Sequence, residues 1–248
     1  MSVYVLNCLN IRPYFTWING GVTCLLIETN QGLVLVDTGV GRQDLEHPSQ
    51  RMRWYRWFYR APRDMAQTAI EQVQELGYEP EDVRHIILSH AHLDHAGGLV
   101  DFQWAKVHVL QKELDTIKNK PNWKYLPEQW AHQPNWEAHT TKGAKWLGID
   151  AIQLEGFSPE VWMLDLPGHT PGLAGVVIQT ESGWLLYGSD ALPYNARVDL
   201  VPRWFAHFFM YHHAPKIRRL VKEYPEIQIL SGHMPKAFYK KTSKFAKN

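Results

Sequence analysis

The stretch SHAHLDHAGG, from Ser89 to Gly98, places three histidines and one aspartate within six consecutive positions. It directly follows HIIL, from His85 to Leu88, which is typical of a β-strand. Imidazole and carboxylate groups packed this closely repel their like neighbours when charged and are costly to bury without a cation. The stretch therefore predicts a metal site where a strand leaves the core, and a solvated, histidine-rich turn is the alternative.

The order of the four polar residues indicates more than one ion. In an extended segment side chains at i and i+2 point the same way, so His90 and His92 can reach one cation together. Asp94 and His95 come where the chain should turn into a helix, and the glycines that follow permit close backbone approach. The change of direction aims this second pair at a different point, which favours two neighbouring cations.

Two ions of four to five ligands each need about three further ligands. The sequence offers His169 in LPGHTPG, Asp190 in LLYGSD and His233 in ILSGHMP, each where a strand gives way to a loop. The two oxygens of a carboxylate such as Asp190 can bridge two cations roughly 3.5–4 Å apart. The isolated histidines have no supporting pattern and are expected to be solvated in loops; they are His47, His108, His132 and His139.

Length and composition bound the class of protein. The chain has 248 residues, a formal charge of +1 and 45% hydrophobic residues, which fits a single domain over residues 1–248. It has no apolar span of 18 residues and no secretory signal, so we expect a cytoplasmic protein without stable membrane insertion. The balanced charge argues against a nucleic-acid partner. Cys8 and Cys24 are expected to be buried free thiols.

Strand and helix patterns alternate along the chain. Residues 24–29 and 32–39 predict a hairpin that turns at Asn30–Gly32, and residues 64–77 show helical spacing that ends at Gly77. Residues 41–63 have no clean periodicity. Further strands are expected within 82–89, 106–111, 161–166 and 226–233, and a hairpin over 174–190 turns at Glu181–Gly183.

These motifs together resemble the metallo-β-lactamase-fold hydrolases. The HxHxDH pattern is met by His90, His92, Asp94 and His95, and the later GHTPG, strand-end aspartate and SGH come in the family's order. VDTG, at residues 36–39, is similar to the family's early strand and turn. The resemblance spans about residues 20–235.

The resemblance implies an α+β fold, a four-layer αββα sandwich of two packed sheets with helices outside. It also implies two divalent ions, with zinc the expected metal and iron, manganese or cobalt the alternatives. One ion would be held by His90, His92 and His169, and the other by Asp94, His95 and His233, with Asp190 between them. Asp37 would orient a ligand or, equally, cap a turn.

Within the superfamily the residue types narrow the choice. True β-lactamases lack the aspartate bridge, glyoxalase II enzymes carry a helical extension after the last ligand, and flavin-linked oxygen reductases replace one histidine of the first cluster by glutamate. The chain looks most like the small quorum-quenching lactonases, which act on N-acyl homoserine lactones. Those carry a tyrosine soon after the bridging aspartate that helps to bind the substrate carbonyl. Tyr194 is the candidate, one position later than in that pattern.

The resemblance thus implies a dinuclear-metal hydrolase that cleaves a small-molecule ester, most simply a lactone, by a metal-bridging hydroxide, with Asp94 as the proton shuttle. A thioesterase, a phosphodiesterase, a mononuclear-iron sulfur oxidoreductase and a non-catalytic binding module are the alternatives. Three aromatic segments, residues 52–59, 122–136 and 203–213, either wall an apolar cleft or pack between helices and in a homodimer contact. Their candidate cleft residues are Trp54, Trp57, Phe58, Trp204, Phe205 and Phe208.

Overall fold

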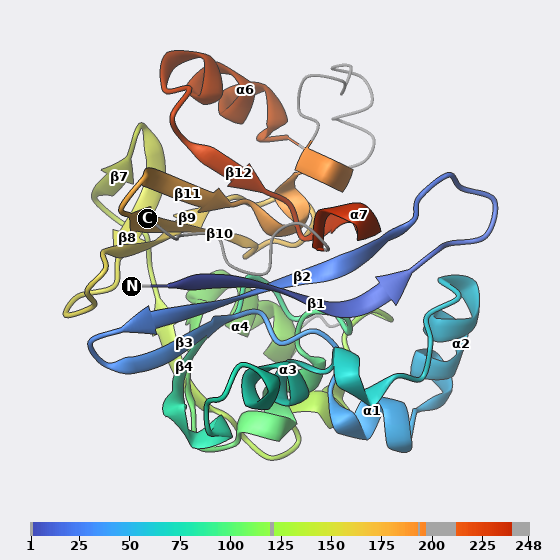
Figure 1. The fold of residues 1–248 in the computed structure, drawn as a ribbon. Coiled ribbons are helices and arrows are strands. Elements are labelled where there is room, and N and C mark those ends of the chain that lie inside the picture. The colour runs from blue at the N-terminus through green and yellow to red at the C-terminus, as the bar shows by residue number, and fades with distance from the viewer. Residues whose placement is uncertain (1, 120–121, 193, 197–211, 240–248) are drawn as a thin grey trace.

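Two β-sheets lie face to face in the computed structural model of the chain, which describes residues 2–119, 122–192, 194–196 and 212–239 (Figure 1). The first sheet runs in the order β1 (Val3–Ile11), β2 (Gly20–Thr29), β3 (Gly32–Val36), β4 (Val83–Ile87), β5 (Lys106–Leu110) and β6 (Asn135–His139), and β13 (His233–Pro235) pairs with the start of β2. The second sheet runs in the order β12 (Gln228–Leu230), β11 (Gly183–Tyr187), β10 (Ala174–Thr180), β9 (Val161–Asp165), β8 (Ile149–Gln153) and β7 (Ala144–Trp146).

Local sequence explains the two expected hairpins. β2 and β3 pair antiparallel from Leu25–Val36 to Thr29–Gly32, and Gly32 takes a positive φ of 100° that suits glycine. β10 and β11 pair up to Thr180–Gly183, so the predicted turn is confirmed. β3, β4, β5 and β6 pair in parallel, which brings the ends of β3, β4 and β5 to one edge of the first sheet.

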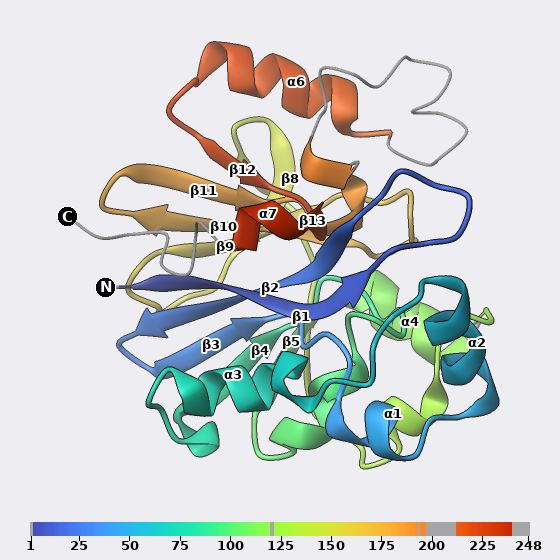
Figure 2. The ribbon, with the colours of Figure 1, turned by 45° about the vertical axis from the view of Figure 1, so that its right-hand side comes forward.

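Three apolar layers hold the sheets and helices together. Alternate residues of the first sheet, including Ile86 and Val107, pack outward against Ile70 and Val73. The opposite face, including Ile87, packs against the second sheet. The outer face of the second sheet packs against two residues of the C-terminal region, Ile217 and Leu220. Helices thus cover the outside of both sheets (Figure 2), and the predicted αββα sandwich is confirmed.

The helices are α1 (Arg42–Glu46), α2 (Gln50–Phe58), α3 (Ala69–Glu75), α4 (Gln111–Asn119), α6 (Ala214–Glu223) and α7 (Lys236–Tyr239). The predicted helix at residues 64–77 is α3, but it starts later because Thr68 is extended and separates it from a short 3₁₀ turn at Met65–Gln67. α2 lies in the segment without clean periodicity. Its start is capped by the Ser49 hydroxyl, and its buried residues are only Met52 and Tyr55.

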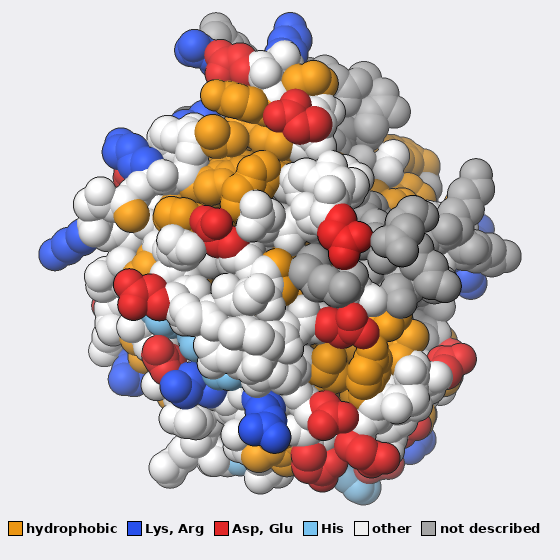
Figure 3. All heavy atoms as spheres, turned by 60° about the vertical axis from the view of Figure 1, so that its left-hand side comes forward, with side chains coloured by type: hydrophobic (Ala, Val, Ile, Leu, Met, Phe, Trp, Pro, Cys, Tyr) orange, Lys and Arg blue, Asp and Glu red, His pale blue; other side chains and the backbone are white. Residues whose placement is uncertain are grey.

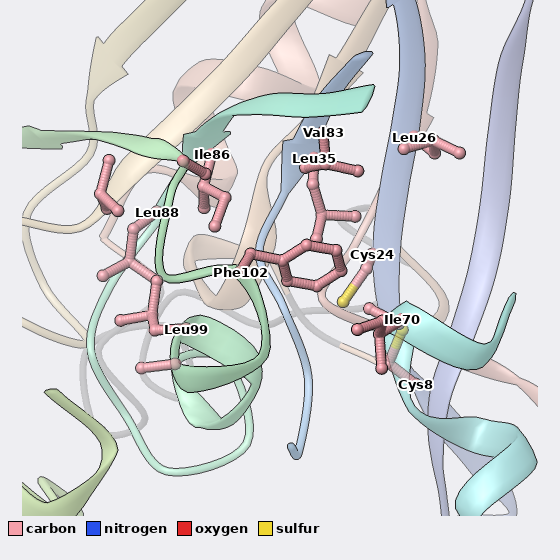
Figure 4. Packing of buried hydrophobic residues seen from close by; sticks show 14 of the residues in the cluster. Cys8, Cys24, Leu26, Leu35, Ile70, Val83, Ile86, Leu88, Leu99 and Phe102 are labelled. Carbon is pink, nitrogen blue, oxygen red and sulfur yellow. The ribbon is translucent and has the colours of Figure 1, made fainter. Parts of the chain in front are cut away.

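Both cysteines are free and buried, as predicted. Their side chains lie close together between β1, β2 and α3, next to Ile70 (Figure 4). Burial raises the pKa of the Cys24 thiol well above its usual range, so this thiol stays protonated and packs as a small apolar group.

Charged side chains of both signs are spread over the face of the molecule shown in Figure 3, between patches of hydrophobic side chains. Among the described residues, none of the helices combines the length and the apolar character that a membrane crossing needs.

Candidate metal centre

The seven predicted ligands come together at one edge of the sandwich. Four of them follow β4: His90, His92, Asp94 and His95. Asp190 lies in the 3₁₀ turn Ser189–Ala191, which follows β11, and His233 begins β13. Three overlapping groups of side chains place their ligand atoms within 4.8 Å of one another: His90, His92 and His169; His90, His95 and Asp190; and Asp94, His95 and His233. The first and third groups are the two triads that the family resemblance implied.

Asp190 lies between the two triads. Its Oδ2 is 3.3 Å from His169 Nε2, and its Oδ1 is 3.6 Å from His95 Nε2 and 3.4 Å from His233 Nε2. One carboxylate oxygen thus faces each half of the cluster, as a bridging ligand requires.

Unpaired buried atoms test whether the cluster fits metal ions. Nε2 of His90, His92 and His95 and Oδ1 of Asp190 are buried and have no hydrogen-bond partner. Leaving such groups unpaired costs about 1–3 kcal/mol each. Nitrogen and carboxylate ligands are the donor set of zinc and related divalent ions, so the residues present fit these ions.

The protonation states also suit a cation. Burial keeps the pKa of His90 and of His92 well below the usual range, so both rings are neutral. Burial acts in the same direction on His95, but Asp190, Asp37 and Asp94 outweigh it and raise the pKa of this ring to about 10. The carboxylates thus draw positive charge into the cluster, and a divalent ion can supply it.

Asp37 orients His95 from behind. Its Oδ2 accepts hydrogen bonds from His95 Nδ1 at 2.8 Å, from the Ser89 hydroxyl at 2.7 Å and from the Tyr187 hydroxyl at 2.8 Å, and its Oδ1 accepts from the Ser89 backbone at 2.7 Å. Because Asp37 holds one hydrogen of His95 on Nδ1, a cation that displaces the other ring proton would be bound by the lone pair of Nε2.

A carboxylate that no sequence motif indicated connects two of the ligand loops. Glu113 accepts from the Ala91 backbone at 2.9 Å and from the Tyr125 hydroxyl at 3.0 Å, and its other oxygen accepts from the Thr170 hydroxyl at 2.7 Å. It therefore joins the loop of His90 to that of His169. It lies in α4, about 20 positions after the first motif, and no local pattern marks it.

Close backbone packing brings the turn against the sheet. A Cβ atom on Gly98 would lie 2.8 Å from the Thr38 carbonyl oxygen, and one on Gly232 would lie 2.3 Å from Asp190 Oδ1. The expectation that glycines after His95 permit close approach is therefore confirmed for Gly98.

A cavity of about 70 Å³ opens onto the cluster. Besides the ligands and Leu93 it is lined by Tyr55, Tyr59, Trp123 and Lys124. The Tyr55 hydroxyl donates to Asp94 Oδ2 at 2.8 Å. These four residues come from the predicted aromatic segments, but the sequence did not mark them individually, since aromatic spacing alone does not say which ring points inward.

Tyr194 does not line this cavity. Its hydroxyl donates to the Asn19 carbonyl at 2.9 Å, and its ring lies edge-on against Trp17. This placement gives no support to its predicted contact with a substrate carbonyl. Trp54, Trp57 and Phe58 are exposed, and Trp204, Phe205 and Phe208 lie outside the described residues.

Comparison with known proteins agrees with this geometry. Residues 17–233 match the metallo-beta-lactamase superfamily. A probable metallo-hydrolase of Mycobacterium tuberculosis is 38% identical over 204 residues, which cover 80% of this chain and 65% of that protein. An N-acyl homoserine lactonase of a Bacillus species is 32% identical over 172 residues, which cover 68% of this chain and 63% of that protein. The matched part thus spans just under two thirds of the length of these relatives.

Solved structures share the fold. An N-acyl homoserine lactone hydrolase, with N-hexanoyl-L-homoserine bound at its catalytic metal centre, superposes with a TM-score of 0.72 at 24% identity, over 94% of this chain and 93% of that one. A dizinc quorum-quenching lactonase superposes with a TM-score of 0.62 at 21% identity, over 88% of this chain and 74% of that one.

Proposed function

The chain belongs to the metallo-beta-lactamase superfamily, and from this premise we propose that it is a metal-dependent hydrolase that opens a lactone of the N-acyl homoserine type. The observation that carries the proposal is the convergence of two ligand triads around Asp190, with four buried ligand atoms unpaired. The lactonases among its sequence relatives support the choice of substrate.

We assign one divalent ion to His90, His92 and His169, a second to Asp94, His95 and His233, and Asp190 to both. Zinc is the proposed metal, because histidine-rich sites with carboxylates suit it. Bound ions of this kind supply an activated water at neutral pH and polarise a carbonyl. The protein's own side chains would hold the ligands in place, transfer protons and stabilise the negative charge that develops on the ester.

Asp94 is the proposed proton carrier. The Tyr55 hydroxyl fixes its Oδ2, and Asp94 also lines the cavity in which a substrate would lie. A carboxylate held at the reacting centre can take the proton of the attacking water and pass it to the leaving alkoxide. Opening a lactone leaves the new carboxylate and the new hydroxyl on one molecule. The leaving alkoxide therefore stays near Asp94, which can protonate it there.

Lys124 is the cationic side chain among the residues that line the cavity. Its charge would stabilise the negative charge that develops on the ester oxygen and on the carboxylate product. With the Tyr194 hydroxyl bonded to Asn19, Lys124 replaces Tyr194 as our candidate for this task.

A panel of substrates tests the proposal. We expect acid release from N-acyl homoserine lactones in a pH-stat, loss of this release on chelation, and two metal ions per chain. Activity that survives complete metal removal would refute the mechanism. Activity confined to thioesters or phosphodiesters would refute the substrate, and oxygen consumption with one iron per chain would favour the oxidoreductase alternative.

We propose further that residues 1–248 form a single domain, since both sheets share the apolar layer between them. A cytoplasmic location is supported by the two free thiols, because reducing compartments keep thiols free.

A further inference from the structure

A second group of histidines lies on the inner face of the first sheet, away from the ligand loops. His85, His108 and His139 come from the neighbouring parallel strands β4, β5 and β6. His85 Nδ1 is 3.0 Å from His108 Nε2, and His108 Nδ1 is 2.9 Å from His139 Nε2. The rings stack, with centroids 5.2 Å apart in both pairs. We call these residues, with Glu137, the strand histidine cluster.

The expectation of solvated loop histidines is therefore wrong for three of the four. His108 is 4% exposed, His139 lies in β6, and both ring nitrogens of His132 are buried. The strand register explains the arrangement. His108 pairs with Glu137, and Leu110 pairs with His139. Residues two apart on a strand share a face, so the side chains of His108, Glu137 and His139 lie on the same face of the sheet. One ligand atom from each of His108, Glu137 and His139 lies within 4.8 Å of the other two.

From this geometry we propose that His108, Glu137 and His139 bind a third divalent cation of the zinc class, separate from the catalytic centre. Two nitrogens on one tetrahedral zinc ion lie about 3.3 Å apart, given bonds of about 2.0–2.1 Å. The pair of facing nitrogens, His108 Nδ1 and His139 Nε2, needs to open by only a few tenths of an ångström.

His85 completes the arrangement. A histidine that binds a metal usually donates its other ring hydrogen to an acceptor, which fixes its tautomer. If His108 binds through Nδ1, its Nε2 hydrogen points at His85 Nδ1, at 3.0 Å. Without an ion, the same three rings can form a chain of hydrogen bonds between neutral imidazoles. The experiment must distinguish this metal-free chain from a metal site.

The charges around the cluster suit a cation. Burial, together with the neighbouring rings of His139 and His85, lowers the pKa of His108 to about 3, so the ring is neutral and has a lone pair to offer. The hydrogen bond from Lys106 lowers the pKa of Glu137, so this carboxylate is ionised. Lys106 Nζ lies 2.9 Å from Glu137 Oε2 and therefore competes with an ion for the carboxylate.

An ion can reach the cluster, and its binding would have a structural effect. A cavity of about 570 Å³ lies over His108, Glu137 and His139 and is lined on the other side by residues of β8 and by Phe157 and Trp162. β6 ends the path of strands in the first sheet, so the ion would join it to β5. The inferred site would thus hold the edge strand β6 to its neighbour β5.

The test measures zinc bound per full-length chain by equilibrium dialysis against buffered free zinc, followed by elemental analysis. His139→Gln removes one ligand, and His47→Gln is the matched control, because His47 is exposed and lies outside the cluster. We expect wild type and His47→Gln to bind one more equivalent than His139→Gln. Since the cluster shares no residue with the catalytic centre, lactone hydrolysis by all three proteins should be equal when that centre is loaded.

Lys106→Gln gives a second measurement with the opposite sign. Removing the competing ammonium should tighten the extra equivalent several-fold, whereas a variant that merely damages the fold would weaken it. The proposal is overturned if His139→Gln and wild type bind the same amount of zinc at every free concentration, or if Lys106→Gln leaves the binding of the last equivalent unchanged. Neither result would test the proposed catalytic centre, because that centre is tested separately by the rate of lactone hydrolysis.

Discussion

Replacing Asp37 by asparagine should weaken the binding of the proposed second ion by His95 while leaving the shape of the site unchanged. Asp37 Oδ2 accepts three hydrogen bonds, and only one of them comes from a group that cannot adapt. The hydroxyls of Ser89 and Tyr187 can rotate to accept from a new amide hydrogen. His95 Nδ1 would face an NH₂ group, and two N–H donors that point at each other cannot form a hydrogen bond.

The magnitude follows from the two ways in which His95 can respond. If its hydrogen stays on Nδ1, a buried donor is left unpaired at a cost of about 1–3 kcal/mol of folding free energy. If the ring changes tautomer, Nε2 carries the hydrogen and can no longer bind a cation. Losses of this kind around metal sites typically reduce affinity or activity by about 10–100-fold. We therefore expect zinc affinity at the second ion to fall by this factor, with kcat falling in parallel.

The assay is a zinc titration that follows bound metal and lactone hydrolysis on the same samples. Asp44→Asn is the control, because Asp44 is also a buried aspartate of the same region but bonds to Gln129 and to the Gly41 backbone. If Asp37→Asn binds two ions with wild-type affinity, the proposed orienting role of Asp37 is incorrect.

Four further predictions test the rest of the site. Tyr55→Phe removes the hydrogen bond to Asp94, so kcat should fall about 10–100-fold with little change in KM, as steady-state kinetics would show; an unchanged kcat would contradict the role of Asp94. Gly232→Ala places a Cβ atom 2.3 Å from Asp190 Oδ1, so bound zinc should drop although circular dichroism still reports a folded protein. Burial raises the pKa of Asp44 to about 7, so the folded state keeps a proton that the unfolded state loses, and stability should fall as pH rises from about 4 to 7. Asp44→Asn should abolish this slope in denaturant titrations and gain up to about 4 kcal/mol at pH 8. Chelation should lower both activity and the melting temperature, and added zinc should restore them; a melting temperature that does not respond would count against a metal held by the folded state.

Much of the proposed metal cluster could be predicted from the sequence, because its candidate ligands are confined to short segments. His90, His92, Asp94 and His95 are four neighbours in one turn, and backbone periodicity decides where each can point. His169, Asp190 and His233 each follow a strand pattern, and strand ends gather at the edges of sheets. Apolar runs likewise predicted most of the strands, whereas their packing into two sheets was implied only by the family resemblance.

The helices were predicted less well. α2 buries only Met52 and Tyr55, and its exposed face carries tryptophans, so its pattern does not show the usual polar outer surface. Tertiary contacts stabilise such a helix, and a single sequence does not contain them.

The sequence by itself determined which side chains could bind metal and that strand ends would present them, since these follow from residue type and backbone periodicity. Only the tertiary structure decided that Glu113 joins two ligand loops, that Tyr55 rather than Tyr194 contacts the cluster, and that His85, His108 and His139 stack across three strands. The physical reason is register: which residues of distant segments face one another depends on how strands pair and sheets pack, and a shift of one residue reverses every side chain.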